Sequence, residues 1–400
     1  MPNNIMKFNS ALTCVDVFSG AGGLSEGFKQ AGFEILLGVD HDEHAVKTFR
    51  KQHGHAIQCD VEKLTANRIR KEIGNRDITV LTAGPPCQAF STVAVAKLKS
   101  LKQNPDVRHP LNILYREFLR LVKDLRPPFF VMENVGRMFS IEHGSIKKEI
   151  EKELKGKYNV EFYYENVSDF GVPQARRRGI AIGNRLGIEN PTLKHTHFDP
   201  KKEPGIRDMK EYVAIRNAIS DLPKIKAGNG DEFTEYPKID RRTLSDYAKQ
   251  RRKNSNGVYN HTARNHGDKD LKIFKMLRPG QWINDLPKRY NRYRQDIFLD
   301  KYKKQEWNKP SSTILAHLSK DGLMFIHPDG KQNRSFTPRE AARLQSFDDS
   351  FVFEGPRTQQ FVQIGNAVPP LFANAVANAI KDSMKMKQTV SVRRASRNCR

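Results

Sequence analysis

The chain has 400 residues, of which 38% are hydrophobic and 28% are charged, and its formal net charge at pH 7 is +24. This composition is typical of a globular protein, and the length is sufficient for two domains with full-sized cores. No run of eighteen apolar residues occurs and the N-terminus lacks the apolar core of a signal peptide, so neither a membrane span nor a secretory leader is expected.

The large positive charge favours a polyanionic partner, and nucleic acid is the natural one; a generally basic protein is the alternative. The charge is unevenly distributed along the chain. Residues 241–310 hold 19 Lys and Arg against 7 Asp and Glu, a net charge of +12, and residues 381–400 hold 7 against 1. The positive charge is therefore concentrated in these two segments.

The chain has four cysteines and none of them forms a C-x-x-C pair. Neither a metal site of the zinc type nor a disulfide framework is therefore predicted. A chain with this use of cysteine is expected in a reducing, intracellular compartment. The four residues are Cys14, Cys59, Cys87 and Cys399.

The first predicted unit is a strand, a glycine turn and a helix. The apolar run Leu12–Phe18 has strand character, the stretch Ser19–Gly23 contains three glycines, and apolar residues then recur at helical spacing. Glycines allow a ligand to approach the backbone because no Cβ atom is in the way. This order is typical of the opening of a nucleotide-binding βαβ unit.

Two further predicted strands end in carboxylates. The strand at 33–39 leads to Asp40, where a ribose hydroxyl is typically held, and the strand at 56–59 leads to Asp60, which is placed to accept from an adenine amino group. The alternative for both residues is capping of the helix-like segment that follows. The glycine run lacks the full spacing of a pyrophosphate site, so S-adenosylmethionine, which has an adenosine but no phosphate, fits better.

A fourth predicted strand, at 78–83, ends in the turn Gly84-Pro85-Pro86-Cys87. Glycine and two prolines break the strand and stiffen the turn, which suits a nucleophile because its sulfur then needs no further ordering. A buried structural thiol is the alternative. The next predicted helix covers 111–125, and a strand at 129–132 delivers Glu133, which is either an acid/base partner of Cys87 or a surface glutamate.

The following segment is predicted to complete the sheet. A helix is expected at 146–154, a strand at 158–164 and another strand at 179–183. Three consecutive arginines, Arg176, Arg177 and Arg178, precede the last strand. Such a run is usually a solvated face, although one or two of the guanidinium groups could point into the site and bind base or phosphate oxygens.

The fold class predicted from these patterns is α/β, with a Rossmann-like sheet covered by helices on both faces and a smaller irregular domain. Residues 1–190 are assigned to the first domain and the basic, aromatic-containing residues 191–335 to the second. Residues 336–382 are expected to return to the first domain, beginning with a helix that Thr337 caps and that Glu340 completes as a capping box. The basic tail 383–400 lacks periodicity and is expected to be disordered.

Six stretches, in order, resemble the motifs of the cytosine-C5 DNA methyltransferases, and the layout resembles prokaryotic enzymes of the restriction-modification type. They are Asp16–Gly23, Gly84–Ser91, Glu133–Val135, Gln174–Arg178, Thr337–Gln345 and Gln363–Pro370. The resemblance covers most of the chain, from about residue 12 to 190 and from about 335 to 380. It implies a S-adenosylmethionine-dependent enzyme in which residues 191–335 are the target-recognition domain.

The resemblance also implies roles for individual residues. Cys87 would attack C6 of a flipped-out cytosine, Glu133 would bind and protonate N3, and Arg178 with Arg176 would hold O2. The cofactor pocket would be lined by Phe18, Gly20, Gly22, Gly23, Asp40, His41, Asp60, Val61, Pro86, Leu111, Asn366 and Val368. His41 departs from the family, in which a larger aromatic residue is common at the position that contacts the adenine.

The partners that the resemblance implies are double-stranded DNA and, encoded nearby, a restriction endonuclease without a stable complex. The protein is expected to be a monomer in the prokaryotic cytoplasm, associated with the nucleoid. A transfer-RNA cytosine-C5 methyltransferase is the nearest alternative, but the Cys-Phe-Thr tract of that branch is absent. A non-catalytic DNA-binding relative is the other alternative, and the presence of Cys87, Glu133 and Arg178 argues against it.

Overall fold

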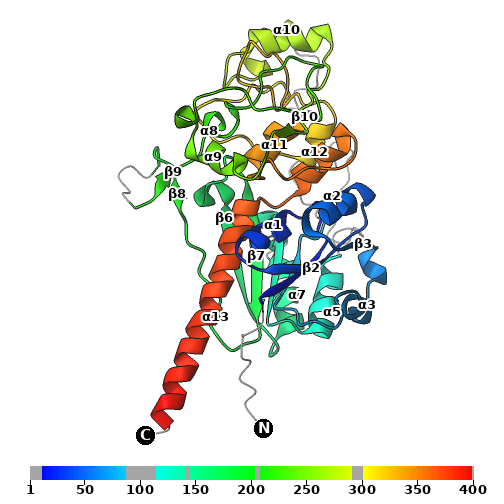
Figure 1. Ribbon diagram of the computed structural model, residues 1–400, viewed down its shortest axis with the longest axis vertical. Coiled ribbons are helices and arrows are strands. Elements are labelled where there is room, and N and C mark those ends of the chain that lie inside the picture. Colours follow the sequence, from blue (N-terminus) through cyan, green and yellow to red (C-terminus); the bar gives the residue numbers. More distant parts are fainter. Residues whose placement is uncertain (1–10, 87–113, 141–143, 203–207, 291–300, 399–400) are drawn as a thin grey trace.

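The computed structural model describes residues 11–86, 114–140, 144–202, 208–290 and 301–398, with side chains as far as residue 385 (Figure 1). A seven-stranded sheet with the order β3-β2-β1-β4-β5-β7-β6 forms the core of the lower part in Figure 1. The strands are β1 (Thr13–Val17), β2 (Glu34–Asp40), β3 (Ala56–Gln58), β4 (Val80–Ala83), β5 (Phe129–Asn134), β6 (Asn159–Asn166) and β7 (Arg177–Asn184). This arrangement confirms the predicted α/β class.

The sheet is parallel except for β7, which runs antiparallel to both β5 and β6. Each of the strands that had been predicted is present, within a few residues of its predicted bounds. Strands β1, β4 and β5 are buried along their whole length, which explains their continuous apolar runs. Because the carboxyl ends of parallel strands meet at one edge, β1, β2, β4 and β5 deliver their following turns to the same place.

Helices cover both faces of this sheet, as predicted. The apolar side chains of α5, α6 and α7 pack on one face, and those of α1 and α13 pack on the other. The helices of this part are α1 (Gly23–Gln30), α2 (Glu43–His53), α3 (Ala66–Glu72), α5 (Tyr115–Leu125), α6 (Gly136–Ser140) and α7 (Ser145–Leu154), with the 3-10 helices η1 (Val61–Lys63) and η4 (Val167–Phe170). The sheet and its turns are thereby held rigidly.

The upper part of Figure 1 is built from short elements and long connections. Its strand pairs are β8 (His197–Phe198) with β9 (Lys210–Glu211) and β10 (Phe233–Thr234) with β11 (Val258–Tyr259). Its helices are α8 (Ile215–Ile219), α9 (Asp246–Arg252) and α10 (Asp268–Met276), with the 3-10 helices η5 (Arg241–Thr243), η6 (Ile283–Asp285), η7 (Lys288–Tyr290) and η8 (Ala316–Ser319). The assignment of residues 191–335 to a separate domain stays a prediction.

The chain then returns through α11 (Pro338–Leu344), α12 (Arg357–Asn366) and α13 (Pro370–Asn398). The predicted capping box is confirmed, because the Thr337 side chain accepts from the Glu340 amide and the Glu340 carboxylate accepts from the Thr337 amide. The last helix, α13, packs against α1 on one face of the sheet. A Cβ atom on Gly27 of α1 would lie 2.4 Å from Ala373 Cβ of α13, so only glycine permits this approach.

One expectation about the C-terminus is wrong. Residues 383–400 were expected to be disordered, but α13 continues to Asn398 and extends below the rest of the molecule in Figure 1. No glycine or proline follows Pro370, and the segment contains lysine, methionine, glutamine and arginine, so nothing in it stops a helix. Among the described residues, none of the helices combines the length and the apolar character needed to cross a bilayer.

Candidate active site at the strand ends

The turn after β1 adopts a backbone conformation that most residues avoid. Phe18 has φ of 56°, Gly20 of 54° and Gly22 of 97°. A phenylalanine in the left-handed region is strained, and such strain is typical of functional sites. A Cβ atom on Gly20 would meet no atom within 4 Å, whereas one on Gly22 would lie 2.6 Å from His53 Nε2. Gly20 therefore borders open space where a ligand can approach, and Gly22 is closely packed.

Asp40 stands at the end of β2, beside this turn. Its Oδ2 atom accepts a hydrogen bond of 2.8 Å from the Gly20 amide, and its Oδ1 atom accepts one of 2.9 Å from the Asp42 amide. Asp42, and not Asp40, caps α2. The capping alternative therefore fails for Asp40, and its carboxylate instead holds the glycine turn against the end of the next strand.

Asp60 is exposed at the end of β3 and caps η1, where its Oδ1 atom accepts from the Glu62 amide at 3.1 Å. The capping alternative therefore holds for Asp60, although an exposed carboxylate with a second oxygen still has capacity to accept from a ligand. His41 is exposed, and its Nδ1 atom lies 3.3 Å from Asp40 Oδ1. That hydrogen bond to the carboxylate is the main reason why the pKa of His41 is raised.

The remaining predicted cofactor residues fall into three groups. Val61 is buried directly after Asp60, and Pro86 is half-buried at the end of the described turn after β4. Val368 is buried while Asn366 is exposed, and the carbonyl of Val368 lies 2.2 Å from the position of a Cβ atom on Gly23. The C-terminal motif is thus brought into contact with the glycine turn. Leu111 and Cys87 lie outside the described residues.

Two groups at the end of β5 face the turn that leads to Cys87. Asn134 Nδ2 donates a hydrogen bond of 2.9 Å to the carbonyl oxygen of Pro85. The nearest atom to a Cβ atom on Gly84 would be Glu133 Oε2, at 3.8 Å. Glu133 is therefore beside the turn and is not the surface glutamate of the alternative interpretation; it is 7% exposed.

Glu133 and Arg178 form an ion pair across β5 and β7. Arg178 Nε lies 2.8 Å from Glu133 Oε1, and both side chains are about nine-tenths buried, with 11% and 10% exposed. In the antiparallel pairing Glu133 is opposite Ile180, so the two charged side chains meet near the strand ends. An acid and a cation held together in this way offer both a proton carrier and a donor to a planar polar ring.

The three arginines have different environments. Arg177 is exposed, Arg178 is the partner of Glu133, and Arg176 is 3% exposed. The guanidinium group of Arg176 donates to the carbonyl oxygens of Ile314, Gly365 and Ala367. Its burial lowers its pKa well below the usual value. These bonds direct the Arg176 side chain to the C-terminal motif. The predicted contact between Arg176 and a cytosine stays a prediction.

Two residues of the site were not singled out from the sequence. One is Asn134, whose link to Pro85 depends on a contact 49 residues away. The other is Asp16, which is fully buried and accepts from Ser25 and Thr82 hydroxyl groups at 2.7 and 2.8 Å. Burial raises the pKa of Asp16 to about 6. A carboxylate inside an otherwise apolar strand was the available signal for Asp16.

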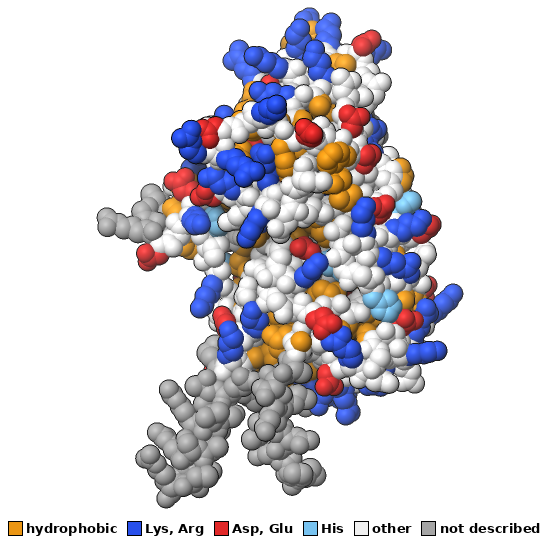
Figure 2. Space-filling model, viewed as in Figure 1, with side chains coloured by type: hydrophobic (Ala, Val, Ile, Leu, Met, Phe, Trp, Pro, Cys, Tyr) orange, Lys and Arg blue, Asp and Glu red, His pale blue; other side chains and the backbone are white. Residues whose placement is uncertain are grey.

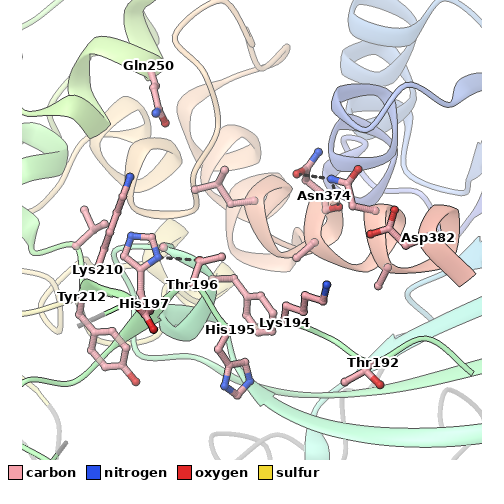
Figure 3. Close-up of a pocket in the computed structure, with 18 of the residues that line it drawn as sticks. Thr192, Lys194, His195, Thr196, His197, Lys210, Tyr212, Gln250, Asn374 and Asp382 are labelled. Atoms are coloured by element: carbon pink, nitrogen blue, oxygen red, sulfur yellow. Dashed lines mark hydrogen bonds between the residues drawn. The ribbon is translucent and has the colours of Figure 1, made fainter. Parts of the chain in front are cut away.

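A cavity of about 1510 Å³ lies apart from these residues, between the connection 187–213, α9 and α13. Lys194, His197 and Lys210 reach it from the connection, and Asn374 and Asp382 line it from α13 (Figure 3). None of the predicted site residues that the structure describes lines this cavity. Nearby, atoms of Glu165, Asp169 and His195 lie within 4.8 Å of one another, but the three side chains are hydrogen-bonded to protein groups, including His195 to Glu165 at 2.8 Å.

Basic side chains gather on the upper part of the molecule (Figure 2). Among them, Lys303 lies 4.8 Å from the ring centre of Trp282, one of the few large apolar side chains that are exposed. This pairing belongs to the segment with the largest excess of Lys and Arg. A positive surface with exposed aromatic groups is typical of a nucleic-acid-binding face.

The chain is similar to known proteins along most of its length. The family model described as C-5 cytosine-specific DNA methylase matches residues 12–382. The type II methyltransferase M.DdeI of Desulfomicrobium norvegicum is 35% identical over 92% of this chain and 88% of its own, and M1.HphI of Haemophilus parahaemolyticus is 35% identical over 92% and 87%. A solved structure of an Escherichia coli prophage protein, assigned as a DNA modification methyltransferase, is 26% identical with a TM-score of 0.69 and covers 94% of this chain and all of its own.

Proposed function

Since the chain belongs to the C-5 cytosine-specific DNA methylase family, we propose a residue-by-residue account of how it methylates C5 of cytosine in DNA with S-adenosylmethionine. The observation that carries the account is the buried Glu133–Arg178 ion pair beside the turn that leads to Cys87. An acid, a cation and a thiol at the ends of adjacent strands are the groups that addition to a pyrimidine ring requires.

In the proposed reaction, the Cys87 thiolate adds to C6 of the cytosine. Glu133 donates a proton to N3 as the sulfur adds, so the ring does not accumulate negative charge. Arg178 donates hydrogen bonds to O2 and stabilises the charge that develops there. Addition makes C5 an enamine carbon that is able to take up a methyl group. The C5 proton then leaves to a base, the electron pair of the C5–H bond reforms the C5–C6 double bond, and the Cys87 thiolate departs from C6. Glu133 takes back the proton from N3, which restores the acid for the next turnover.

The residues at the ends of β1, β2 and β3 fit the cofactor. An adenosine with an amino-acid tail needs open space beside the backbone and acceptors for its hydroxyl and amino groups. The space is found beside Gly20, in a turn where Phe18 and Gly22 also have positive φ angles. The acceptors are the carboxylates of Asp40 and Asp60. S-adenosylmethionine, when bound, supplies the methyl group as an electrophilic carbon on a sulfonium. The residues proposed to hold it are Phe18, Gly20, Gly22, Gly23, Asp40, His41, Asp60, Val61, Pro86, Leu111, Asn366 and Val368.

The target base must leave the duplex to reach Cys87, because its C6 atom is inaccessible within stacked base pairs. We propose that residues 191–335 form the target-recognition domain and that the DNA lies between it and the sheet domain. The excess of Lys and Arg in 241–310 supports this placement, since phosphate contacts supply most of the affinity for DNA. The exposed ring of Trp282, which lies beside Lys303, is an aromatic group of this segment that could stack against that DNA.

The biological setting that we propose is bacterial restriction-modification. M.DdeI and M1.HphI are named as type II methyltransferases, and this chain covers most of the length of both. We infer a monomer in the cytoplasm that acts on the nucleoid and protects sites from a separately encoded endonuclease. A genome in which no endonuclease gene accompanies this one would count against that setting, without affecting the chemistry.

A trapping experiment tests the chemistry. The protein is incubated with S-adenosylmethionine and a duplex that carries 5-fluorocytosine, whose fluorine blocks loss of the C5 substituent and thus release of the sulfur. A covalent adduct at Cys87, located by peptide mapping, is expected from the wild type and not from Cys87→Ala. Parallel reactions with labelled S-adenosylmethionine and either DNA or transfer RNA identify the substrate. An adduct on another residue would overturn the assignment of Cys87.

A further inference from the structure

Arg176 links three parts of the chain that are far apart in sequence. Its Nη1 atom donates to the Ile314 carbonyl at 2.8 Å, and its Nη2 atom donates to the Gly365 and Ala367 carbonyls at 3.3 and 3.2 Å. Its own backbone is held to the end of β6, because the Arg176 amide donates to Asn166 Oδ1 at 3.2 Å and its carbonyl accepts from the Val167 amide at 2.9 Å. One side chain thus ties the sheet to the C-terminal motif.

The two carbonyls at Gly365 and Ala367 lie on either side of Asn366. Asn366 is exposed and is one of the residues proposed to line the cofactor pocket. The same segment is held by Gln345, which donates to the Ile364 and Ala367 carbonyls at 2.7 and 3.3 Å. The position of Asn366 is therefore fixed by the hydrogen bonds that Arg176 and Gln345 donate to the backbone carbonyls around it.

On the sheet side, Arg176 lies close to Glu133 and Arg178, the ion pair that is proposed to hold the base. Arg178 lies two residues beyond Arg176, and its partner Glu133 lies on β5. Glu133 and Arg178 are the charged groups that influence the pKa of Arg176, after burial itself. The exposed Arg177 between them points away. A single short segment therefore presents Arg178 to the base and Arg176 to the backbone of the cofactor-lining segment.

The arginine at this position combines an energetic cost with three hydrogen bonds that link distant segments. Burial of a guanidinium group is costly, and within the described ranges no carboxylate forms an ion pair with Arg176. Its Nε atom is buried without a hydrogen-bond partner. An apolar side chain of similar size would avoid that cost, but it would leave the carbonyl oxygens of Ile314 and Gly365 without this donor. What only arginine supplies is a rigid planar fork that reaches three carbonyl oxygens at once.

We propose that Arg176 is a positioning residue that fixes the distance between the base-binding pair Glu133–Arg178 and the cofactor-lining Asn366. The inference rests on the proposed function, because it takes both sites from there. The methyl-donating and methyl-accepting atoms must be aligned closely, and a displacement of about 1 Å costs on the order of a hundredfold in rate. Arg176 acts on that alignment through Asn366 and not through contact with the cytosine.

The test compares three variants by two measurements. The affinity for S-adenosylmethionine without DNA is measured by calorimetry, and kcat for DNA methylation is measured at saturating cofactor. Arg176→Lys keeps the charge but loses the fork, and is expected to weaken cofactor affinity by roughly tenfold and also to lower kcat. Arg178→Lys is expected to lower kcat without changing the affinity for cofactor. The exposed neighbour is the matched control, and Arg177→Ala is expected to bind the cofactor like the wild type.

A double-mutant cycle shows whether Arg176 acts through Asn366. Asn366→Ala, in which only an exposed side chain is removed, should weaken cofactor binding, and Arg176→Lys in that background should weaken it little further. Additive effects would overturn the inference. So would wild-type cofactor affinity in Arg176→Lys with a reduced kcat, which would indicate direct contact with the base. Failure of Arg176→Lys to fold would also overturn it, because the role would then be stability. Absence of cytosine methylation by the wild type would instead refute the proposed function.

Discussion

Asn134 Nδ2 donates a 2.9 Å hydrogen bond to the carbonyl oxygen of Pro85, two residues before Cys87. The bond joins the end of β5, next to Glu133, to the turn that follows β4. The Oδ1 atom of Asn134 accepts a hydrogen bond of 2.8 Å from the Val135 amide, and this bond fixes the orientation of the Asn134 side-chain amide. The turn that leads to Cys87 is therefore held at Pro85 by the residue adjacent to the proposed proton donor.

Replacement of Asn134 by alanine is expected to lower kcat more than it lowers cofactor affinity. The Pro85 carbonyl is buried and would lose its partner, which costs about 1–3 kcal/mol and releases the turn. We expect a fall in kcat of roughly tenfold or more, measured by single-turnover methylation, with little change in the dissociation constant for S-adenosylmethionine. Asn254→Ala, at an exposed position, is the control. An equal loss in both quantities would mean that the bond supports the fold in general.

Glu133→Gln tests the proton donor. Glutamine has the same shape as glutamate, so the site should stay folded. It has neither the charge that pairs with Arg178 nor a transferable proton. We expect kcat to fall by about 10²–10⁴, the range for loss of general acid catalysis. Rapid-quench measurement of a single turnover separates this loss from any change in product release. A variant that kept more than a tenth of the wild-type rate would remove Glu133 from the proposed mechanism.

The strands and their ends were predictable because each is a short apolar run followed by a break. The run before Gly84 became β4, and the run before Glu133 became β5, within a few residues. The cap at Thr337 was also predictable, since a capping box depends on residues three positions apart. These features are local, and local patterns of hydrophobicity and turn residues determine them.

The functions of the three arginines were not predictable in the same way. Arg176 contacts Ile314 and Gly365, which are 138 and 189 residues away, so no pattern near Arg176 distinguishes it from Arg177. The antiparallel placement of β7 between β5 and β6, which brings Arg178 to Glu133, also depends on pairing between distant strands. The helical continuation to Asn398 was missed because periodicity indicates a buried face, and a helix can extend without one.

Gly20→Ala is expected to reduce the affinity for the cofactor, while the free energy of unfolding falls only by the cost of local backbone strain. Gly20 has φ of 54° and open space at its Cβ position, so alanine would cost about 1–2 kcal/mol of backbone strain and place a methyl group where the cofactor approaches. Gly74 provides a matched control, because it has φ of 64° and equally open space but lies away from the strand ends. Both variants should lose similar stability in urea, and Gly20→Ala alone should bind S-adenosylmethionine more weakly, by tenfold or more. Equal cofactor affinities would exclude Gly20 from the cofactor pocket.

Two buried histidines predict that the protein loses stability as the pH falls below about 6.5. Burial lowers the pKa of His53 to about 3 and that of His266 to about 4, from an ordinary value of 6.5. The unfolded chain therefore takes up these two protons at a higher pH than the folded chain does. The stability that the neutral rings provide is fully present above pH 6.5 and is lost on acidification through this window, by about 1.4 kcal/mol per pH unit for each ring.

Asp16 opposes this trend, because its pKa is raised to about 6 from an ordinary value of 3.8. Its protonated form is favoured in the folded chain, so Asp16 adds stability as the pH falls from about 6 towards 4. Burial also lowers the pKa of His261 and of His327, so these rings act in the same direction as His53 and His266. The histidines outnumber this carboxylate, and the free energy of unfolding should therefore still fall as the pH falls from 6 to 5. The measurement is a set of urea titrations at pH 7.5, 6.5, 6.0 and 5.0.

The histidine contribution is isolated with His266→Gln. His266 Nε2 lies 2.9 Å from the Ser335 hydroxyl, and a glutamine amide retains the ability to bond to that group without titrating. Above pH 6.5 the free energy of unfolding of the variant should differ from that of the wild type by a constant amount. Below that pH the slope of its free energy of unfolding against pH should be smaller than that of the wild type by about 1.4 kcal/mol per pH unit, which corresponds to one proton. An unchanged slope would mean that this ring is already protonated in the folded chain or reaches water there, and that the acid sensitivity comes from other groups.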